Sequence, residues 1–385
     1  ALWVRGLMLA LLSVSLVALF TEYAHAVAFA KTYGGTGSEG AFSVQQTSDG
    51  GYIVAGRTYS FGAGWYDIFL IKTDANGNLR WAKTYRGTDY DGASHVQQTS
   101  DGGYMLAGVT RSFGAGESDI FLIKTDADGN IQWAKTYGGT YSEEAYSVQQ
   151  TSDGGYIVAG RTGSWPNYDI FLIKTDANGN IQWAKTYGGT NWDEARSVQQ
   201  TSDGGYIVAG LTNSFGAGGS DIFLIKTDAN GNIQWAKTYR GTYDDWAFSV
   251  QQTSDGGYIV AGWTRSFGAG FYDIFLIKTD ANGNIQWAKT YGGTNWDEAR
   301  SVQQTSDGGY IVAGYTYSFG AGSWDIFLIK TDADGNIGSC SIVRSVSPTV
   351  TTPSLTVTTP SPSISSPSFT VNSPSPTVTS PTLTV

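Results

Sequence analysis

The sequence predicts an all-β fold, a six-bladed β-propeller with four-stranded blades, and two repeated blocks carry this prediction. The phrase SVQQTSDGGYIVAG, or a close variant, occurs six times, with its valine at positions 44, 96, 148, 198, 250 and 302. A second block that begins DIFLIKTD follows each copy, with its aspartate at positions 67, 119, 169, 221, 273 and 325. Successive valines are 52, 52, 50, 52 and 52 residues apart, and periods of this length indicate a propeller or a solenoid.

Each repeat divides into four predicted strands, which read SVQQT, YIVAG with two further residues, DIFLIKTD and IQWAKTYG. The SDGG and DANGN or DADGN turns contain Asp-Gly, Gly-Gly or Asn-Gly pairs, which supply the positive φ of tight hairpins. The second and third strands are the most apolar, as expected for central strands between neighbouring blades. Polar SVQQT is expected to be the innermost strand, beside a wet central channel.

The two ends of the repeat region predict how the ring closes. Residues 29–35 read FAKTYGG, which is a fourth strand without a preceding repeat, and the sixth unit stops after Ile337 where a fourth strand should follow. We therefore expect the N-terminal strand to complete the last blade of a propeller over residues 27–338, because closure removes open sheet edges. The fourth-strand anchors would then be Phe29, Trp81, Trp133, Trp183, Trp235 and Trp287. The alternative, an open stack of sheets, would need capping units.

Units with a double glycine, a hydrophobic strand ending in glycine and a later tryptophan resemble kelch-type propellers, and the likeness covers residues 29–337. The spacing departs from a strict kelch pattern. The DGGYIVAG phrase is similar to repeat propellers of uncharacterised secreted archaeal and bacterial proteins. This resemblance implies a surface location and offers no established chemistry.

Residues 1–26 have the pattern of a secretory signal peptide: a short region with Arg5, an apolar run over residues 6–20, and the exit Ala24-His25-Ala26. An extracellular or cell-surface location follows from this prediction. The alternative is a retained apolar helix that packs in a filament core, although about 15 apolar residues are fewer than the roughly 20 that span a bilayer.

Composition excludes several classes of function. The formal net charge of −10 argues against a nucleic-acid partner, which needs a basic face. Cys340 is the single cysteine, so neither an internal disulfide nor a CxxC motif can form. Once residues 1–26 are removed, His95 is the remaining histidine, which argues against histidine metal sites and catalytic triads.

Variation among the six copies falls in two connections, the link into the first strand and the link between the second and third strands. In an up-and-down blade these links lie on one face, which is rich in aromatic and arginine side chains. Such residues are frequent in binding hot spots, so this face is predicted to bind a glycan or a protein; the alternative is that they shield loops and fill gaps between blades. The candidates are Trp65, Tyr66, Tyr90, Arg111, Tyr141, Trp165, Tyr168, Trp192, Tyr243, Arg265, Phe271, Tyr272, Trp296 and Trp324.

An acidic residue precedes the first strand of every copy: Glu39, Asp91, Glu143, Asp193, Asp245 and Asp297. Six carboxylates near the axis would suit Ca²⁺, which takes several oxygen ligands, whereas the alternative is that each accepts N–H bonds in its own loop. No other cofactor is expected. Paired carboxylates such as Asp193-Glu194 recur with the scaffold, so no pair stands out as catalytic and we expect no enzyme.

From residue 339 the sequence consists mainly of Ser, Thr, Pro and Val, which cannot form a core. Residues 339–385 are expected to be an extended stalk that carries O-glycans, or a flexible linker. Together these features predict a secreted, non-enzymatic binding scaffold. The alternative is a structural subunit of a filament or surface layer, self-assembled through the N-terminal helix or the tail.

Overall fold

The computed structural model describes residues 29–338, except 63–64, 217 and 321–322. It also describes residues 342–346 and the triplets 349–351, 356–358, 363–365, 370–372 and 377–379. The predicted signal peptide or N-terminal helix, residues 1–26, lies outside the described residues. No helix within the described parts is long and apolar enough to cross a membrane.

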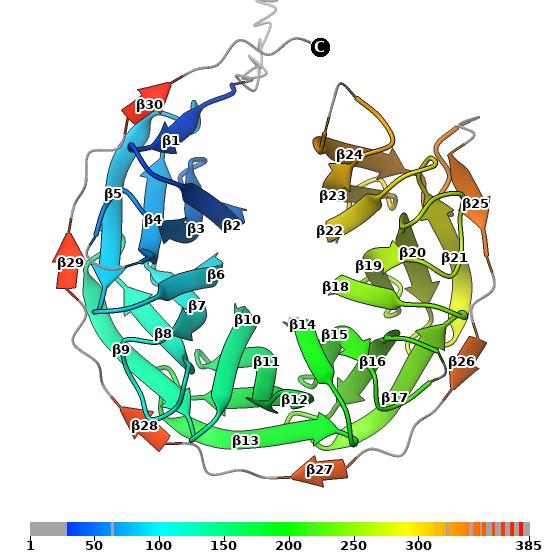
Figure 1. Ribbon diagram of the computed structural model, residues 1–385, viewed down its shortest axis with the longest axis horizontal. Coiled ribbons are helices and arrows are strands. Elements are labelled where there is room, and N and C mark those ends of the chain that lie inside the picture. The colour runs from blue at the N-terminus through cyan, green and yellow to red at the C-terminus, as the bar shows by residue number, and fades with distance from the viewer. Residues whose placement is uncertain are drawn as a thin grey trace, which may run out of the picture.

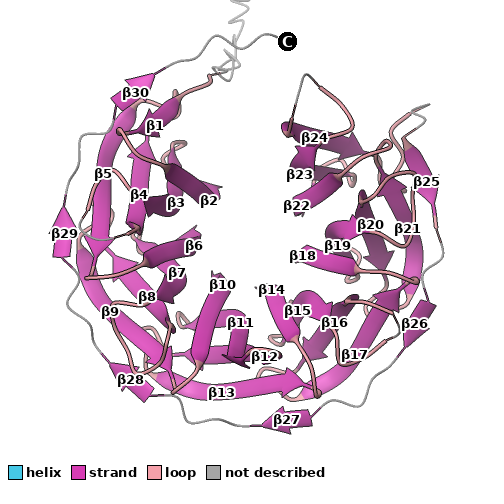
Figure 2. Ribbon diagram, viewed as in Figure 1, coloured by secondary structure: helices cyan, strands magenta, loops and turns pink. Residues whose placement is uncertain are grey.

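Six antiparallel sheets are arranged as blades around a central axis (Figure 1), and the described chain contains strands and loops without helices (Figure 2). The first blade contains β2 (Glu39–Gln46), β3 (Tyr52–Thr58), β4 (Asp67–Thr73) and β5 (Leu79–Arg86), and the second contains β6 (Asp91–Gln98), β7 (Tyr104–Thr110), β8 (Asp119–Thr125) and β9 (Ile131–Gly138). The third blade contains β10 (Ser142–Gln150), β11 (Tyr156–Ser164), β12 (Asn167–Thr175) and β13 (Ile181–Gly188), and the fourth contains β14 (Asp193–Gln200), β15 (Tyr206–Thr212), β16 (Asp221–Thr227) and β17 (Ile233–Arg240). The fifth blade contains β18 (Asp245–Gln252), β19 (Tyr258–Thr264), β20 (Asp273–Thr279) and β21 (Ile285–Tyr291), and the sixth contains β22 (Asp297–Gln304), β23 (Tyr310–Thr316) and β24 (Asp325–Thr331). The predicted six-bladed propeller and its strand order are confirmed.

The blades are held together by apolar clusters that form between each blade and the next. Ile157 and Leu172 of the third blade, for example, pack with Val208 and Phe223 of the fourth, and all four side chains are buried. The second and third strands are apolar on both faces because each face contacts a neighbouring blade. The repeated YIVAG and DIFLIKT sequences therefore build the core.

The Asp-Gly turns are anchored to the third strand by a buried lysine. In the third blade, Lys174 Nζ donates to Asp153 Oδ2 at 2.8 Å, to the Thr175 carbonyl at 2.8 Å and to Gln182 Oε1 at 3.0 Å. Asp153 also accepts from the Thr151 hydroxyl at 2.5 Å and the Gly155 amide at 3.0 Å. All six blades pair the equivalent lysine and aspartate, so the constant turn residues have a structural role.

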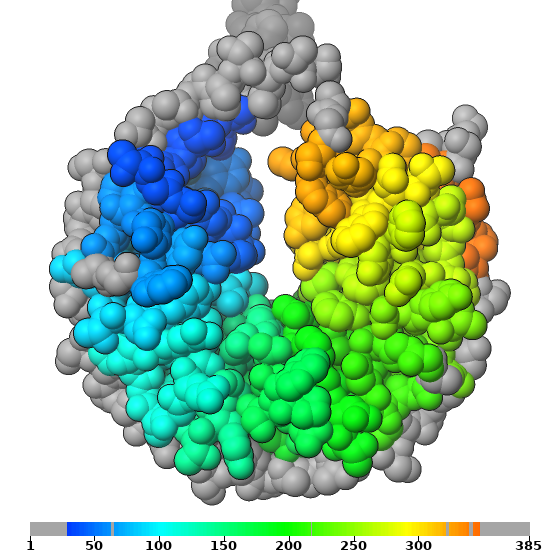
Figure 3. Space-filling view, viewed as in Figure 1, coloured from blue at the N-terminus to red at the C-terminus, as the bar shows by residue number. Residues whose placement is uncertain are grey.

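The predicted closure of the last blade is wrong in one respect. β1 (Thr32–Gly34) pairs with β30 (Thr377–Thr379) and not with β24, so the sixth sheet has three strands. The seam between the sixth and first blades is open (Figure 3). Val44 of the first blade is consequently 66% exposed, whereas Val96 of the second is 2% exposed, and on β24 Ile326 is 87% exposed.

β1 nevertheless has the side-chain contacts of a fourth strand. Tyr33 Oη donates to the Gly77 carbonyl at 2.5 Å, as Tyr85 donates to Gly129 at 2.7 Å one blade later. Phe29 packs on Tyr52 with ring centroids 5.8 Å apart, as each fourth-strand tryptophan packs on the tyrosine of the following blade. These contacts hold β1 against the first blade, on the side where a sixth-blade strand would lie, without pairing it to β24.

The C-terminal segment contributes further strands at the outer edge of the ring. Each pairs antiparallel with one fourth strand or with β1: β25 (Val343–Ser345) with β21, β26 (Thr349–Thr351) with β17, β27 (Thr356–Thr358) with β13, β28 (Ser363–Ser365) with β9, β29 (Thr370–Asn372) with β5, and β30 with β1. An extended segment was expected from its composition, whereas these pairings with the blades were not. The stalk and its glycosylation stay predictions.

Candidate functional site

The two variable links of each repeat meet at one face, which we call the loop face. The Asp91 amide, in the link into the second blade, donates to the Tyr66 carbonyl of the first blade at 2.8 Å. The Arg111 amide, after the second strand, donates to the Tyr90 carbonyl at 2.8 Å. The same interleaving recurs around the ring, for example between Asp297 and Tyr272 at 2.9 Å. Backbone hydrogen bonds therefore fix the variable links relative to one another.

Aromatic side chains form a continuous chain of ring contacts across the third to sixth blades, which we call the aromatic arc. Successive centroid distances are 5.9, 6.1, 5.1, 4.4, 4.7 and 5.9 Å along Trp165, Trp192, Trp246, Trp263, Tyr272, Trp296 and Trp324. Trp165 is 72% exposed, whereas Trp263 is only 7% exposed. The arc thus has a buried middle and exposed ends. Trp246 and Trp263 were not among the predicted residues.

The first two blades carry a second cluster, built around Arg57. Its Nη1 donates to the Tyr90 hydroxyl at 2.8 Å, and its guanidinium lies 4.5 Å from the centroid of Tyr66. Trp65, which is 73% exposed, lines a cavity of about 310 Å³ with Asp89, Tyr90 and Arg111.

The remaining predicted residues are distributed along the loop face. Phe271 lines a cavity of about 300 Å³ with Trp296 and Trp324. Arg265 lies 5.4 Å from the ring of Tyr243. The guanidinium of Arg161 lies 4.4 Å from the ring centroid of Tyr168, and Tyr141 is exposed. Part of the predicted set therefore packs together, which the shielding alternative also predicts.

The residues at the bulge of each first strand were not among the predicted site residues. Each first strand has a β-bulge at the residue after its alanine, and this one position varies while its neighbours stay almost constant. A bulge redirects a side chain, and here the redirected residues line a cavity of about 550 Å³ that we call the axial cavity. They are Phe42, Ser94, Tyr146, Arg196, Phe248 and Arg300. Comparison of the repeats column by column would have found them.

Charges around the axial cavity are paired. Arg161 contacts Glu144 at 2.9 Å and Glu194 at 3.1 Å, and Arg196 also pairs with Glu194. Burial would lower the pKa of Arg161, but Tyr146 and the two carboxylates raise it above its ordinary value. On the other side of the cavity, Arg300 pairs with Glu298 at 2.6 Å. The site therefore offers hydrogen-bonding groups with little net charge.

Arginines also cover aromatic rings within the axial cavity. The guanidinium of Arg196 lies 4.2 Å from the ring centroid of Tyr146, and that of Arg300 lies 4.0 Å from the centroid of Phe248. Such contacts hold long side chains in place. The cavity walls are thus preorganised.

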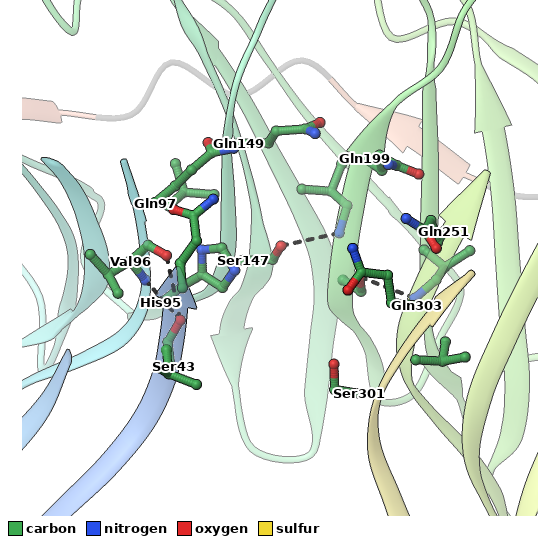
Figure 4. Close-up of a pocket in the computed structure, with 17 residues that line it drawn as sticks. Ser43, His95, Val96, Gln97, Ser147, Gln149, Gln199, Gln251, Ser301 and Gln303 are labelled. Atoms are coloured by element: carbon green, nitrogen blue, oxygen red, sulfur yellow. Dashed lines mark hydrogen bonds between the residues drawn. The ribbon is translucent and has the colours of Figure 1, made fainter. Parts of the chain in front are cut away.

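A polar channel runs along the axis and is lined by the Ser-Val-Gln triplets of the first strands (Figure 4). Most of its polar groups are used between blades: the Gln150 amide donates to Gln97 Oε1 at 2.6 Å, and the Val198 amide donates to the Ser147 hydroxyl at 3.2 Å. Burial lowers the pKa of His95 to about 4, so this imidazole is neutral at pH 7. The channel is therefore mainly structural, as its repetition suggests.

The six acidic residues considered for a Ca²⁺ ring, Glu39, Asp91, Glu143, Asp193, Asp245 and Asp297, each accept hydrogen bonds in their own blade. Asp193 accepts from the Thr212 hydroxyl, the Ser214 hydroxyl at 2.6 Å and the Gly189 amide at 2.8 Å, and the other five carboxylates accept equivalent bonds in their own loops. Within the described residues no group of three His, Cys, Asp or Glu side chains could hold a metal ion. The loop-anchoring alternative accounts for these residues.

Comparison with known proteins supports the fold and little more. Residues 305–337 match a family described as a β-propeller domain of unknown function, DUF5122. The regulatory protein FlaEY of Caulobacter vibrioides is 30% identical over 140 residues, which are 31% of this chain and 15% of that protein. The chain thus matches only a small part of that relative.

Among solved structures, Sqt1 from Chaetomium thermophilum has a TM-score of 0.45 and 10% identity, covering 74% of this chain and 70% of that one. Sqt1 bound to the N-terminus of the ribosomal protein L10 has a TM-score of 0.41 and 10% identity, covering 73% and 71%. These likenesses are too distant to carry an argument about function. The six blades and the DUF5122 match together identify a β-propeller.

Proposed function

We propose that this propeller is a non-enzymatic binding protein that takes a neutral glycan on its loop face, over the axial cavity and the aromatic arc. One observation carries the proposal: the bulge position varies between a constant alanine and a residue that is serine in five of the six copies, and the six side chains at this position meet in one cavity. A scaffold position that only maintained the fold would be expected to repeat like the residues beside it. Variation concentrated at a cavity is the pattern of a binding site on a repeated scaffold.

The chemistry of the cavity favours a neutral, polar ligand. Aromatic rings such as Phe42 and Tyr315 present flat apolar surfaces against which the C–H faces of sugar rings pack. The Arg300–Glu298 pair offers both donors and acceptors for hydroxyl groups while its charges cancel. An anionic ligand is disfavoured, because binding to one of these arginines would break its ion pair and leave a glutamate carboxylate without a partner next to the ligand. We expect no turnover, because no carboxylate pair is set apart from the repeat.

A protein partner is the second candidate, favoured by the exposed aromatic residues at the rim. Trp65 and Trp165 are 73% and 72% exposed, and Phe271 is 63% exposed. Exposed aromatic residues spread over several blades exceed the needs of a small sugar and are typical of protein-binding hot spots. The location proposed with either candidate is extracellular or at the cell surface, and the intact mass of the native protein tests it by showing whether residues 1–26 are removed.

A glycan array probed with the full chain tests the first candidate, followed by calorimetric titration of any glycan that binds. Phe42→Ala and Arg300→Ala should each weaken binding by about tenfold or more. Asn178→Ala, in a constant turn, is the matched control and should bind as the wild type does. Absence of binding to any neutral glycan, or equal loss in the control, would refute the proposal. A protein that binds the wild type and is lost with Trp165→Ala would favour the second candidate.

A further inference from the structure

The outer edges of the fourth strands bind the C-terminal segment in one repeated register. In each pairing a valine or isoleucine of the segment lies opposite the same tyrosine of the repeat. The pairs are Tyr291 with Val343, Tyr239 with Val350, Tyr187 with Val357, Tyr137 with Ile364, Tyr85 with Val371, and Tyr33 with Val378. The same register in all six pairings indicates that the short repeat of the segment is matched to the longer repeat of the blades.

The sequence of the segment has the period that this arrangement requires. Residues 343, 350, 357, 364, 371 and 378 are seven apart, and each is Val or Ile. Prolines at 353, 360, 367, 374 and 381 follow the same seven-residue period, and all lie outside the paired triplets, where no ladder donor is needed. β-branched residues in the paired positions and proline between them suit an extended segment that forms one short strand per blade.

The edge that receives the segment is anchored by buried, hydrogen-bonded tyrosines. Tyr187 is fully buried, and its hydroxyl donates to the Gly231 carbonyl of the next blade at 2.7 Å. Equivalent bonds hold the tyrosines of the other fourth strands and of β1. A strand edge held in this way offers its backbone groups in a fixed geometry. It therefore satisfies the main requirement for strand addition by an extended peptide.

Side chains of the first heptad show how the segment adds to the core. Val343 packs against the cluster between the fifth and sixth blades, and Val346 packs against the cluster between the fourth and fifth. The Val346 amide donates to the Ala288 carbonyl at 3.0 Å. The segment thus contacts two blade junctions within four residues.

We propose that the outer rim is a peptide-binding surface with six equivalent positions, whose ligand is an extended peptide with a β-branched residue at every seventh position. The resident ligand is this chain's own C-terminal segment, whose described strands β25 to β30 each pair with one blade edge or with β1, and which we call the belt. Belt strands cover the fourth-strand edges, which would otherwise be open to pairing with other chains. The belt also links neighbouring blades, from the fifth blade to β1, in a ring whose seam is open. This proposal is independent of the glycan proposal, since the rim and the loop face are different surfaces.

Hydrogen exchange of the full chain, read by mass spectrometry with residue-level fragmentation, tests the belt. The amides of triplets such as 356–358 should exchange at least about tenfold more slowly than those of the residues between triplets. Equal exchange in triplets and intervening residues would overturn the proposal.

A proline substitution provides the matched comparison. Val357→Pro should remove protection from residues 356–358 and from their partners 186–188, while Ser361→Pro, in the same heptad but outside the triplet, should leave both protected. Continued protection of residues 170–175 in β12 will show that the blade itself remains folded. If both variants behave alike, the paired register is not the source of protection and the proposal is overturned.

The oligomeric state distinguishes the chain's own belt from one supplied by a second copy. Light scattering should give the monomer mass, with triplet protection that does not change on dilution. A dimer whose triplet protection falls on dilution would overturn the assignment to the same chain, and it would place the segment of a second copy on the rim.

Discussion

The constant Asp-Gly turns should be structural, and Asp153→Asn in the third blade is the sharpest test. The Lys174 side chain is 4% exposed and that of Asp153 is 52% exposed, with Nζ and Oδ2 2.8 Å apart. The substitution removes the charge that compensates a buried ammonium, and it leaves that ammonium with the Thr175 carbonyl and Gln182 as acceptors. A buried charge that loses its partner destabilises the fold.

The pKa of Asp153 sets the size of the effect. Burial would raise this pKa, but hydrogen bonds from Lys174, Thr151 and the Gly155 amide lower it to about 2. Lowering the pKa of this carboxyl from its ordinary value of about 3.9 to about 2 corresponds to about 2.5 kcal/mol. Because the carboxylate is half exposed, solvent screening reduces this to about 1–2 kcal/mol.

Urea unfolding of the full chain, followed by tryptophan fluorescence, measures the loss at pH 7. Ser152→Ala, at the adjacent exposed position, is the control and should be neutral. Since the folded pKa of Asp153 is lowered, its contribution is present above about pH 4 and is lost as the pH falls toward 2, so variant and wild type should converge there. An Asp153→Asn protein as stable as the wild type at pH 7 would refute the reasoning, and the constant turns would then become candidates for a functional surface.

Three further substitutions test the account of the scaffold. Burial, with a smaller contribution from Asp193, raises the pKa of Asp169 to about 6. The fold therefore favours the protonated carboxyl, and this contribution to stability is present below about pH 4 and lost as the pH rises through 6. Asp169→Asn should flatten thermal stability between pH 4 and 6 and add about 1 kcal/mol at pH 7, and an unchanged pH profile would contradict this. Gly210→Ala places a Cβ 1.8 Å from the Glu194 carbonyl oxygen and should cost about 3 kcal/mol in urea unfolding, whereas Gly40→Ala, whose Cβ meets only the Phe42 ring at 3.8 Å, should be close to neutral. Trp183→Ala removes the ring contact with Tyr206 at 5.9 Å and the bond to the Ala229 carbonyl, and should lower the unfolding midpoint by the equivalent of about 3 kcal/mol; an unchanged midpoint would show that this junction is not limiting.

Much of the candidate site could be anticipated because variation among repeats is visible in the sequence. The exposed Trp65, Trp165 and Trp324 lie on the loop face, where the order of strands in a blade placed them. The axial residues, such as Phe42 and Arg196, were not predicted because each lies at a β-bulge. A bulge interrupts the regular alternation of side chains, so the direction of these residues does not follow from their place in the strand. For the six acidic residues the sequence left two roles open, a shared metal or local loop anchoring, and the hydroxyl groups that donate to Asp193 in its own blade agree with the second.

The sequence by itself determined the number of blades, the four-strand repeat and the hairpin turns, since these depend on residues close together in the chain and are repeated six times. Which strand edges pair over long distances was decided only by the tertiary structure. β1 is three residues long and contacts the first blade through Phe29 and Tyr33, as a fourth strand would, but it pairs with β30 and not with β24, the partner that the repeat pattern predicted. The C-terminal segment looked like a stalk because no core can be built from Ser, Thr and Pro alone. The segment needs no core of its own where the edge of an existing sheet supplies its hydrogen bonds, as β13 and β17 do.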